Sequence, residues 1–93
     1  MTLTSPELSI VVPTFNEKQN VVRLVDRITV ALPDVSWEIL FVDDDSPDGT
    51  AELVRGLGEH DVRIRCIQRL NRRGLASACI EGMLASSATF LGV

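Results

Sequence analysis

A continuous apolar run followed directly by three acids places the strongest constraint on how this chain can fold. Residues 38–42 read Glu-Ile-Leu-Phe-Val, without alternation after the glutamate, and residues 43–45 are all aspartate. A strand that is apolar on both faces needs cover on both faces, which is typical of a parallel strand between layers of helix. The run therefore predicts an α/β fold with a parallel sheet, and the acids begin a loop at the carboxyl end of an inner strand.

The segment before this run fits the same architecture. Residues 8–13 are a short apolar run that ends at a proline, which predicts a strand, and residues 1–7 are expected to be a tail. Apolar residues then recur at steps of three and four from Val21 to Leu32, which predicts an amphipathic helix that Pro33 ends. Thr14 or Asn16 is the expected N-cap of this helix.

A second helix is predicted after the acids. Ser46 is a suitable N-cap, and Pro47 would occupy the first helical position, where its missing N–H costs nothing. Gly56 and Gly58 are expected to end this helix.

The remaining segments complete an alternating pattern. Residues 62–67 alternate apolar and charged side chains, which indicates a strand at a sheet edge, and residues 75–86 predict a third helix of small residues. Residues 89–93 begin a fourth strand. The expected fold is a Rossmann-like α/β unit over residues 8–93, with a parallel sheet in the strand order 3-2-1-4.

Composition excludes some classes of function. Nine Lys and Arg against 13 Asp and Glu give the 93 residues a formal net charge of −4, which argues against a nucleic-acid partner. Two cysteines, Cys66 and Cys79, are too few for a disulfide scaffold, and both lie in apolar patterns that indicate buried thiols in a reduced, cytoplasmic setting. No apolar run approaches the roughly 18 residues that span a membrane.

Ligands of open parallel sheets bind beyond the carboxyl ends of the strands, so the loops 13–17, 43–48 and 68–74 are where a site is expected. Phe15 offers a flat surface for a base and Glu17 a hydrogen-bond acceptor. One acid of residues 43–45 is expected to bind a ligand and another to cap a helix. The last loop is basic: Arg72 and Arg73 could meet a diphosphate, and a solvated turn is an equal alternative. The first strand is followed by neither a Gly-x-Gly-x-x-Gly fingerprint nor a phosphate loop.

Three stretches in this order carry a resemblance to a known family. Residues 10–17 (IVVPTFNE), residues 39–50 (ILFVDDDSPDGT), and residues 73–78 (RGLASA) with 81–83 (EGM) resemble the N-terminal half of family 2 glycosyltransferases of the GT-A fold. The second and third stretches are most similar to the dolichyl- or polyprenyl-phosphate mannosyltransferase subgroup.

The resemblance implies a role for individual residues. Pro13, Phe15 and Glu17 would line the pocket for base and ribose. Asp44, the second acid of the Val-Asp-Asp pattern, would accept hydrogen bonds from the base, with Val42 packed nearby. Arg73, or its neighbour Arg72, would reach toward the diphosphate.

The implied reaction is an inverting transfer of a sugar, with mannose favoured, from a nucleoside-diphosphate sugar to polyprenyl or dolichyl phosphate. GDP-mannose is the favoured donor, and the cytoplasmic face of a membrane is the expected place. In this family the fourth strand leads into an Asp-x-Asp motif that binds Mg²⁺ or Mn²⁺, and this sequence ends before that point. The 93-residue chain is therefore expected to be inactive by itself and to contain no catalytic residue.

Other interpretations remain open at this point. A nucleotidyltransferase-like domain would be expected to carry a Gly-rich loop after the first strand, and a receiver-like domain would carry an acid pair there. The chain could also be an α/β fragment without a ligand. Separately, Phe90, Leu91 and Val93 would leave an apolar sheet edge that favours self-association.

Overall fold

Strand β2 (Trp37–Asp43) lies inside the sheet, and each of its seven residues is buried. The computed structural model describes residues 6–70 and 90–92. Arg72, Arg73, Cys79 and the predicted helix over residues 75–86 lie outside the described residues. Within them, the continuous apolar run forms a strand covered on both faces, as its sequence predicts.

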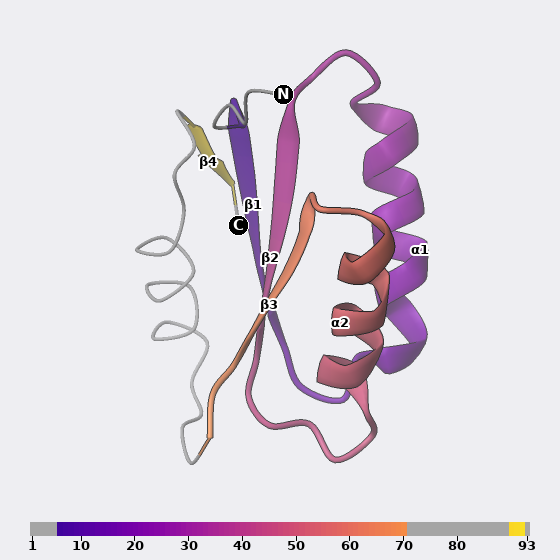
Figure 1. The fold of residues 1–93 in the computed structure, drawn as a ribbon, viewed down its shortest axis with the longest axis vertical. Helices are drawn as coiled ribbons and strands as arrows, with labels where there is room; N and C mark the ends of the chain where they lie inside the picture. Colours follow the sequence, from indigo (N-terminus) through magenta and orange to yellow (C-terminus); the bar gives the residue numbers. More distant parts are fainter. Residues whose placement is uncertain (1–5, 71–89, 93) are drawn as a thin grey trace.

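The strands that the structure describes form one parallel sheet in the order β3-β2-β1-β4. Strand β1 (Leu8–Thr14) pairs with β2 along its whole length, β3 (Ile64–Gln68) pairs with the other side of β2, and β4 (Phe90–Gly92) pairs with the start of β1. The α/β fold with a parallel sheet is thus confirmed. All pairings are parallel, so the carboxyl ends of β1, β2 and β3 meet at one edge of the sheet, at the bottom of Figure 1.

Helices α1 (Lys18–Ala31) and α2 (Thr50–His60) cover one face of the sheet (Figure 1). Their apolar sides pack on the side chains of β2 that point to this face, in a core formed by Val21, Val25, Trp37, Ile39, Phe41, Val54 and Ile64. On the opposite face Val11, Leu40 and Val42 are fully buried and pack with Ile67. The side chains of β2 thus alternate between two buried layers.

Both helices begin later than the sequence predicts. Thr14 is the last residue of β1, and α1 begins at Lys18 after Glu17, which makes no capping bond with its side chain. Helix α2 begins at Thr50, after Gly49 in the left-handed region at φ 88°. Neither Thr14 nor Ser46 serves as an N-cap, because both hydroxyls donate to Asp43 instead.

Gly56 and Gly58 lie inside α2 and do not end it. A Cβ at position 58 would lie 2.7 Å from the backbone carbonyl oxygen of Ile64, whereas a Cβ at position 56 would meet no heavy atom within 4 Å. The prediction that these glycines end α2 is therefore wrong. The glycine at position 58 has a steric reason, because it lets α2 lie close to the start of β3.

This difference gives a matched pair of variants. Gly58→Ala should lower the free energy of unfolding by about 1–3 kcal/mol, because the new methyl group collides with backbone that cannot move freely. Gly56→Ala should raise it by roughly 0.5–1 kcal/mol, because alanine is the better helix former. Urea unfolding of both variants followed by circular dichroism measures the two values, and equal effects would contradict the close approach at Gly58.

Candidate functional site

Three polar residues stand side by side where β1, β2 and β3 end. Thr14 of β1 is the register partner of Asp43 of β2, and Asp43 is the partner of Gln68 of β3. The loops that follow these residues are the ones in which ligands of open parallel sheets bind. This edge of the sheet is therefore the candidate site.

Asp43 joins the end of β1 to the loop after β2 through hydrogen bonds. Its carboxylate is fully buried and accepts hydrogen bonds from the Thr14 hydroxyl at 2.7 Å, the Ser46 hydroxyl at 2.6 Å and the Ser46 amide at 2.8 Å. A buried carboxylate is tolerated when donors surround it in this way. These bonds hold the end of β1 and the loop after β2 on one group, so Asp43 is a structural residue.

The loop after β1 is tied to the loop after β2 by its backbone amides. The Asn16 amide donates to the Ser46 hydroxyl at 2.8 Å, the Glu17 amide to the Thr50 hydroxyl at 3.2 Å, and the Lys18 amide to the Asp48 carboxylate at 3.2 Å. The first amides of a helix lack partners within the helix, and here a neighbouring loop supplies them. The two loops therefore form one connected surface.

Asp48 links the N-termini of both helices. Its carboxylate accepts hydrogen bonds from the hydroxyl and the amide of Thr50 and from the amide of Lys18. The pKa of Asp48 lies below its ordinary value of 3.8, mainly because of the bond from the Thr50 hydroxyl, with smaller contributions from the two amides and the Lys18 charge. Asp48, rather than one of residues 43–45, thus binds the first amide of α2.

Asp44 forms a buried ion pair with Arg69. The Arg69 Nε donates to Asp44 Oδ1 at 2.6 Å, and the two side chains are 1% and 11% exposed, respectively. The Asp44 amide also donates to the carbonyl of Thr14 at 3.0 Å. The sequence pattern predicts a basic loop after β3 and gives no buried role to Arg69. The feature that could have indicated this role is an arginine at the end of a strand that pairs with the strand before the acids.

Asp45 has a third environment. It is exposed, has a positive φ of 56°, and accepts a hydrogen bond at 2.9 Å from the side-chain amide of Gln68, which also bonds to Arg55. The three adjacent acids therefore have three different partners, which relieves the repulsion that such a run would otherwise cause.

The described residues that the sequence predicts for nucleotide binding lie around this edge. Pro13 is the register partner of Val42, which is fully buried. Phe15 is 39% exposed directly after β1, and Glu17 is half-buried, with its carboxylate 2.9 Å from the Asn20 side-chain nitrogen. Strand pairing thus brings Pro13, Val42 and Asp44 together.

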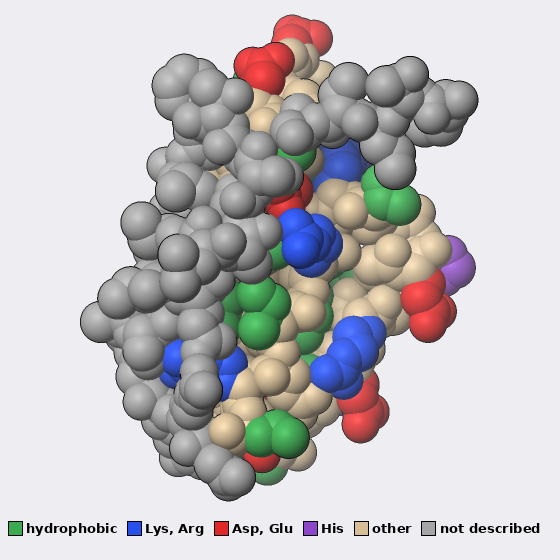
Figure 2. All heavy atoms as spheres, turned by 60° about the vertical axis from the view of Figure 1, so that its left-hand side comes forward, with side chains coloured by type: hydrophobic (Ala, Val, Ile, Leu, Met, Phe, Trp, Pro, Cys, Tyr) green, Lys and Arg blue, Asp and Glu red, His purple; other side chains and the backbone are tan. Residues whose placement is uncertain are grey.

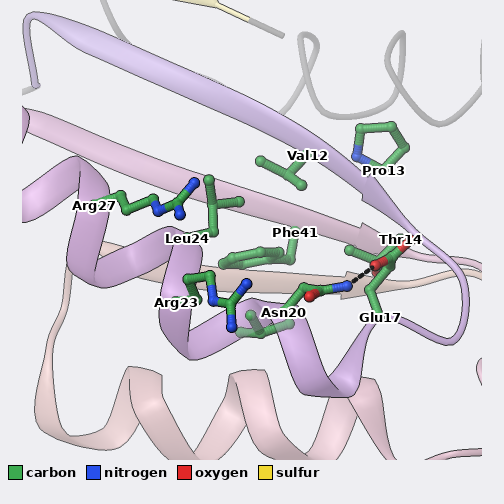
Figure 3. A pocket seen from close by; sticks show the side chains of 10 residues that line it. Val12, Pro13, Thr14, Glu17, Asn20, Arg23, Leu24, Arg27 and Phe41 are labelled. Carbon is green, nitrogen blue, oxygen red and sulfur yellow. Dashed lines mark hydrogen bonds between the residues drawn. The ribbon is translucent and has the colours of Figure 1, made fainter.

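A cavity of about 390 Å³ lies next to this edge, between β1 and α1 (Figure 3). Val12, Leu24 and Phe41 give it an apolar floor, and Arg23 and Arg27 extend from α1 beside it. The lining also includes Pro13, Thr14, Glu17, Asn20 and Val21. The cavity thus shares Pro13, Thr14 and Glu17 with the candidate site but includes neither Phe15 nor Asp44, so the two overlap only in part.

The described surface is mixed in charge and offers no cluster for a metal ion. Acidic and basic side chains are interspersed on the face in Figure 2. Residues 6–70 contain no group of three or more His, Cys, Asp or Glu side chains that could hold a metal. Cys66 is half-buried, and burial raises the pKa of its thiol. Within the same residues, no helix has the length and apolar character needed to cross a bilayer.

Comparisons with known proteins agree on one family. The family described as "Glycosyl transferase family 2" matches residues 9–93. The chain is 40% identical over 81 residues to a dolichol-phosphate mannosyltransferase of Pyrococcus furiosus and 37% identical over 90 residues to one of Saccharomyces cerevisiae. These alignments cover 87% and 94% of this chain and 23% and 34% of the relatives, so the chain spans about a quarter to a third of their length.

A solved structure gives the same result. The mannosyltransferase PcManGT from Pyrobaculum calidifontis, in complex with GDP-Man and Mn²⁺, superimposes with a TM-score of 0.69 at 26% identity, over 90% of this chain and 25% of that one. A family match over nearly all of the sequence, together with the shared fold, rules out a receiver-like or nucleotidyltransferase-like domain. The chain belongs to glycosyl transferase family 2.

Proposed function

We propose that this chain is the donor-nucleotide part of an enzyme that transfers mannose from GDP-mannose to a polyprenyl phosphate. The observation that carries the proposal is the fixed position of Asp44 at the carboxyl end of β2. Its backbone amide donates a hydrogen bond to the Thr14 carbonyl, and its carboxylate accepts one from Arg69. The similarity to dolichol-phosphate mannosyltransferases and to a GDP-Man complex supports the choice of donor and acceptor.

The chemistry of Asp44 favours particular bases. An ionised carboxylate only accepts hydrogen bonds, so it selects a base with N–H groups on its pairing edge. Guanine presents two adjacent N–H donors there and uracil presents one, whereas adenine places an acceptor nitrogen next to its amino group. A carboxylate at position 44 therefore favours guanine over adenine.

The surrounding residues complete the proposed pocket. Pro13 and Val42 form the apolar floor of the pocket. The exposed Phe15 ring provides a surface for the nucleobase or the ribose, and Glu17 accepts a hydrogen bond from the ribose. Arg73 would contact the diphosphate, as its motif implies.

The reaction needs little acid–base chemistry from this part of the enzyme. A phosphate oxygen of the acceptor is already anionic and can displace the nucleoside diphosphate from the anomeric carbon with inversion. A divalent cation, Mg²⁺ or Mn²⁺, would stabilise the departing diphosphate. We place the protein ligands of this cation outside the described residues. Because the acceptor is a lipid, we place the reaction at a membrane surface, and we propose the cytoplasmic one.

Nucleotide titration of the chain tests this function. By calorimetry the chain should bind GDP more tightly than ADP. Asp44→Asn should weaken GDP binding by about ten- to one hundredfold, because hydrogen bonds to a charged group contribute about this factor to affinity. Asp45→Asn is the matched control, because it removes one charge from the adjacent residue and keeps a side chain that tolerates positive φ.

The two variants separate recognition from general charge loss. Equal losses in Asp44→Asn and Asp45→Asn would mean that the negative charge of the loop, and not Asp44, determines binding. Equal affinity of the unsubstituted chain for GDP and ADP would contradict the proposed base recognition.

A further inference from the structure

Arg69 forms a buried ion pair with Asp44. Asp44 has a proposed ligand, the nucleotide base, whereas neither the motif nor the family resemblance assigns a role to Arg69. We propose that Arg69 is a positioning residue, which orients the Asp44 carboxylate so that it can bind both N–H groups of guanine. This inference rests on the proposed function, because it assigns to Arg69 the geometry of a bond that Asp44 makes to the donor.

The backbones of both residues are fixed. The Arg69 amide donates to the Asp43 carbonyl at 2.7 Å, which extends the pairing of β3 with β2 beyond the last strand residue. The Asp44 amide donates to the Thr14 carbonyl at 3.0 Å on the other side of β2. The two side chains thus start from neighbouring points on a rigid sheet edge.

The side chains meet in a way that restricts Asp44 further. The Nε atom is part of a planar guanidinium, and its 2.6 Å bond to Oδ1 lies in a region where the Arg69 side chain is only 1% exposed. A long side chain that is buried in this way has lost its rotamer freedom on folding. The direction of the Asp44 carboxylate is then set before any nucleotide arrives, and binding does not have to pay for ordering it.

Arg69 also neutralises a carboxylate that is nearly buried. Removing one partner of a buried pair leaves the other charge without compensation, which is why an arginine in this place could be needed for folding alone. The two roles differ in what they predict. A folding role lowers stability and weakens all nucleotides alike, whereas a positioning role changes the selection among bases that differ in one N–H group.

GDP and IDP provide that comparison. Hypoxanthine keeps the ring N–H of guanine but lacks the neighbouring amino group, so the ratio of GDP to IDP affinity measures the second hydrogen bond. An ionised carboxylate accepts up to about four hydrogen bonds, so a bond from Nε is compatible with two bonds from guanine. A correctly oriented carboxylate should bind GDP about tenfold more tightly than IDP.

The experiment is a double-mutant cycle on the 93-residue chain, with GDP and IDP titrated by calorimetry. Arg69→Gln should weaken GDP about tenfold and bring the GDP-to-IDP ratio close to one. In an Asp44→Asn background the same Arg69→Gln substitution should cause no further loss, because Arg69 acts through Asp44. Arg69→Lys keeps the charge without the planar fork, so it should restore stability but not the ratio.

Each outcome bears on one of the two claims. An unchanged GDP-to-IDP ratio in Arg69→Lys and Arg69→Gln, or losses that add to that of Asp44→Asn, would overturn the positioning role and leave the proposed function intact. If Arg69→Gln is unfolded by circular dichroism, Arg69→Lys decides alone. Failure of the unsubstituted chain to bind GDP or IDP would instead contradict the proposed function.

Discussion

Replacing Phe41 with alanine should lower the free energy of unfolding by about 3–5 kcal/mol. The Phe41 ring is 1% exposed and belongs to the core that joins α1 and α2 to the sheet. It also forms part of the floor of the cavity between β1 and α1, so its removal would enlarge an existing space that the backbone of a paired strand cannot close (Figure 3). A domain of this size has only about 5–15 kcal/mol of stability, so the variant should be partly unfolded at physiological temperature.

Thermal unfolding followed by circular dichroism measures this effect. The midpoint for Phe41→Ala should fall by at least about 10 °C, given the usual shift per kcal/mol in small domains. Val30→Ala, at a residue of α1 that is 81% exposed, provides the control and should leave the midpoint nearly unchanged. Similar midpoints for both variants would show that the helix layer does not depend on Phe41.

Asp43→Ala should be nearly as destabilising, by about 2–5 kcal/mol. The substitution removes the acceptor for the Thr14 hydroxyl, which is buried, and for the hydroxyl and amide of Ser46. It also loosens the loop after β1, because the Asn16 amide donates to the same Ser46 hydroxyl. The loss therefore spreads from one carboxylate to both loops of the candidate site.

Urea unfolding distinguishes this role from a simple charge effect. Asp43→Asn retains one acceptor oxygen and should lose less stability than Asp43→Ala, while Asp45→Asn at the exposed neighbour should change stability by less than about 0.5 kcal/mol. A midpoint for Asp43→Ala equal to that of Asp45→Asn would contradict the anchoring role.

The sheet could be predicted from the sequence because its signals are strong and local. The continuous apolar run of β2 indicated cover on both faces, and all seven residues of the strand are buried. The alternation in residues 62–67 indicated an edge strand, and β3 lies at one end of the described sheet, with Arg65 exposed between the buried Ile64 and the half-buried Cys66. Such patterns report burial directly, and burial decides strand position.

The helix starts could not be predicted, because the capping groups come from distant residues. Thr14 and Ser46 are good N-caps by type, but the buried Asp43 carboxylate accepts from both hydroxyls, and the amides at the start of α1 find partners in the loop after β2. Local preference yields to these tertiary contacts. The role of Gly58 also depends on a distant residue, because the absence of a Cβ lets the Ile64 backbone approach α2.

The candidate site shows the same division. The pairing of β1 with β2 could be predicted, and this pairing brings the motif residues Pro13, Val42 and Asp44 together. The partner of Asp44 was not, because an arginine in a basic loop is usually solvated, and only the folded edge shows Arg69 buried against the acid. Arg73 lies outside the described residues, so its role toward the diphosphate stays a prediction.

The most direct test of the central claim is to map the binding of GDP onto the chain residue by residue. In ¹⁵N–¹H correlation spectra of the labelled chain titrated with GDP, the amides of residues 15–17 and 43–45 should shift the most, because these loops form the proposed base pocket. In the Asp44→Asn variant these shifts should be much smaller at the same GDP concentration, because binding is expected to be weaker. Shifts confined to Arg23 and Arg27 beside the cavity, with the amides of residues 15–17 and 43–45 unchanged, would place the ligand elsewhere and contradict the account.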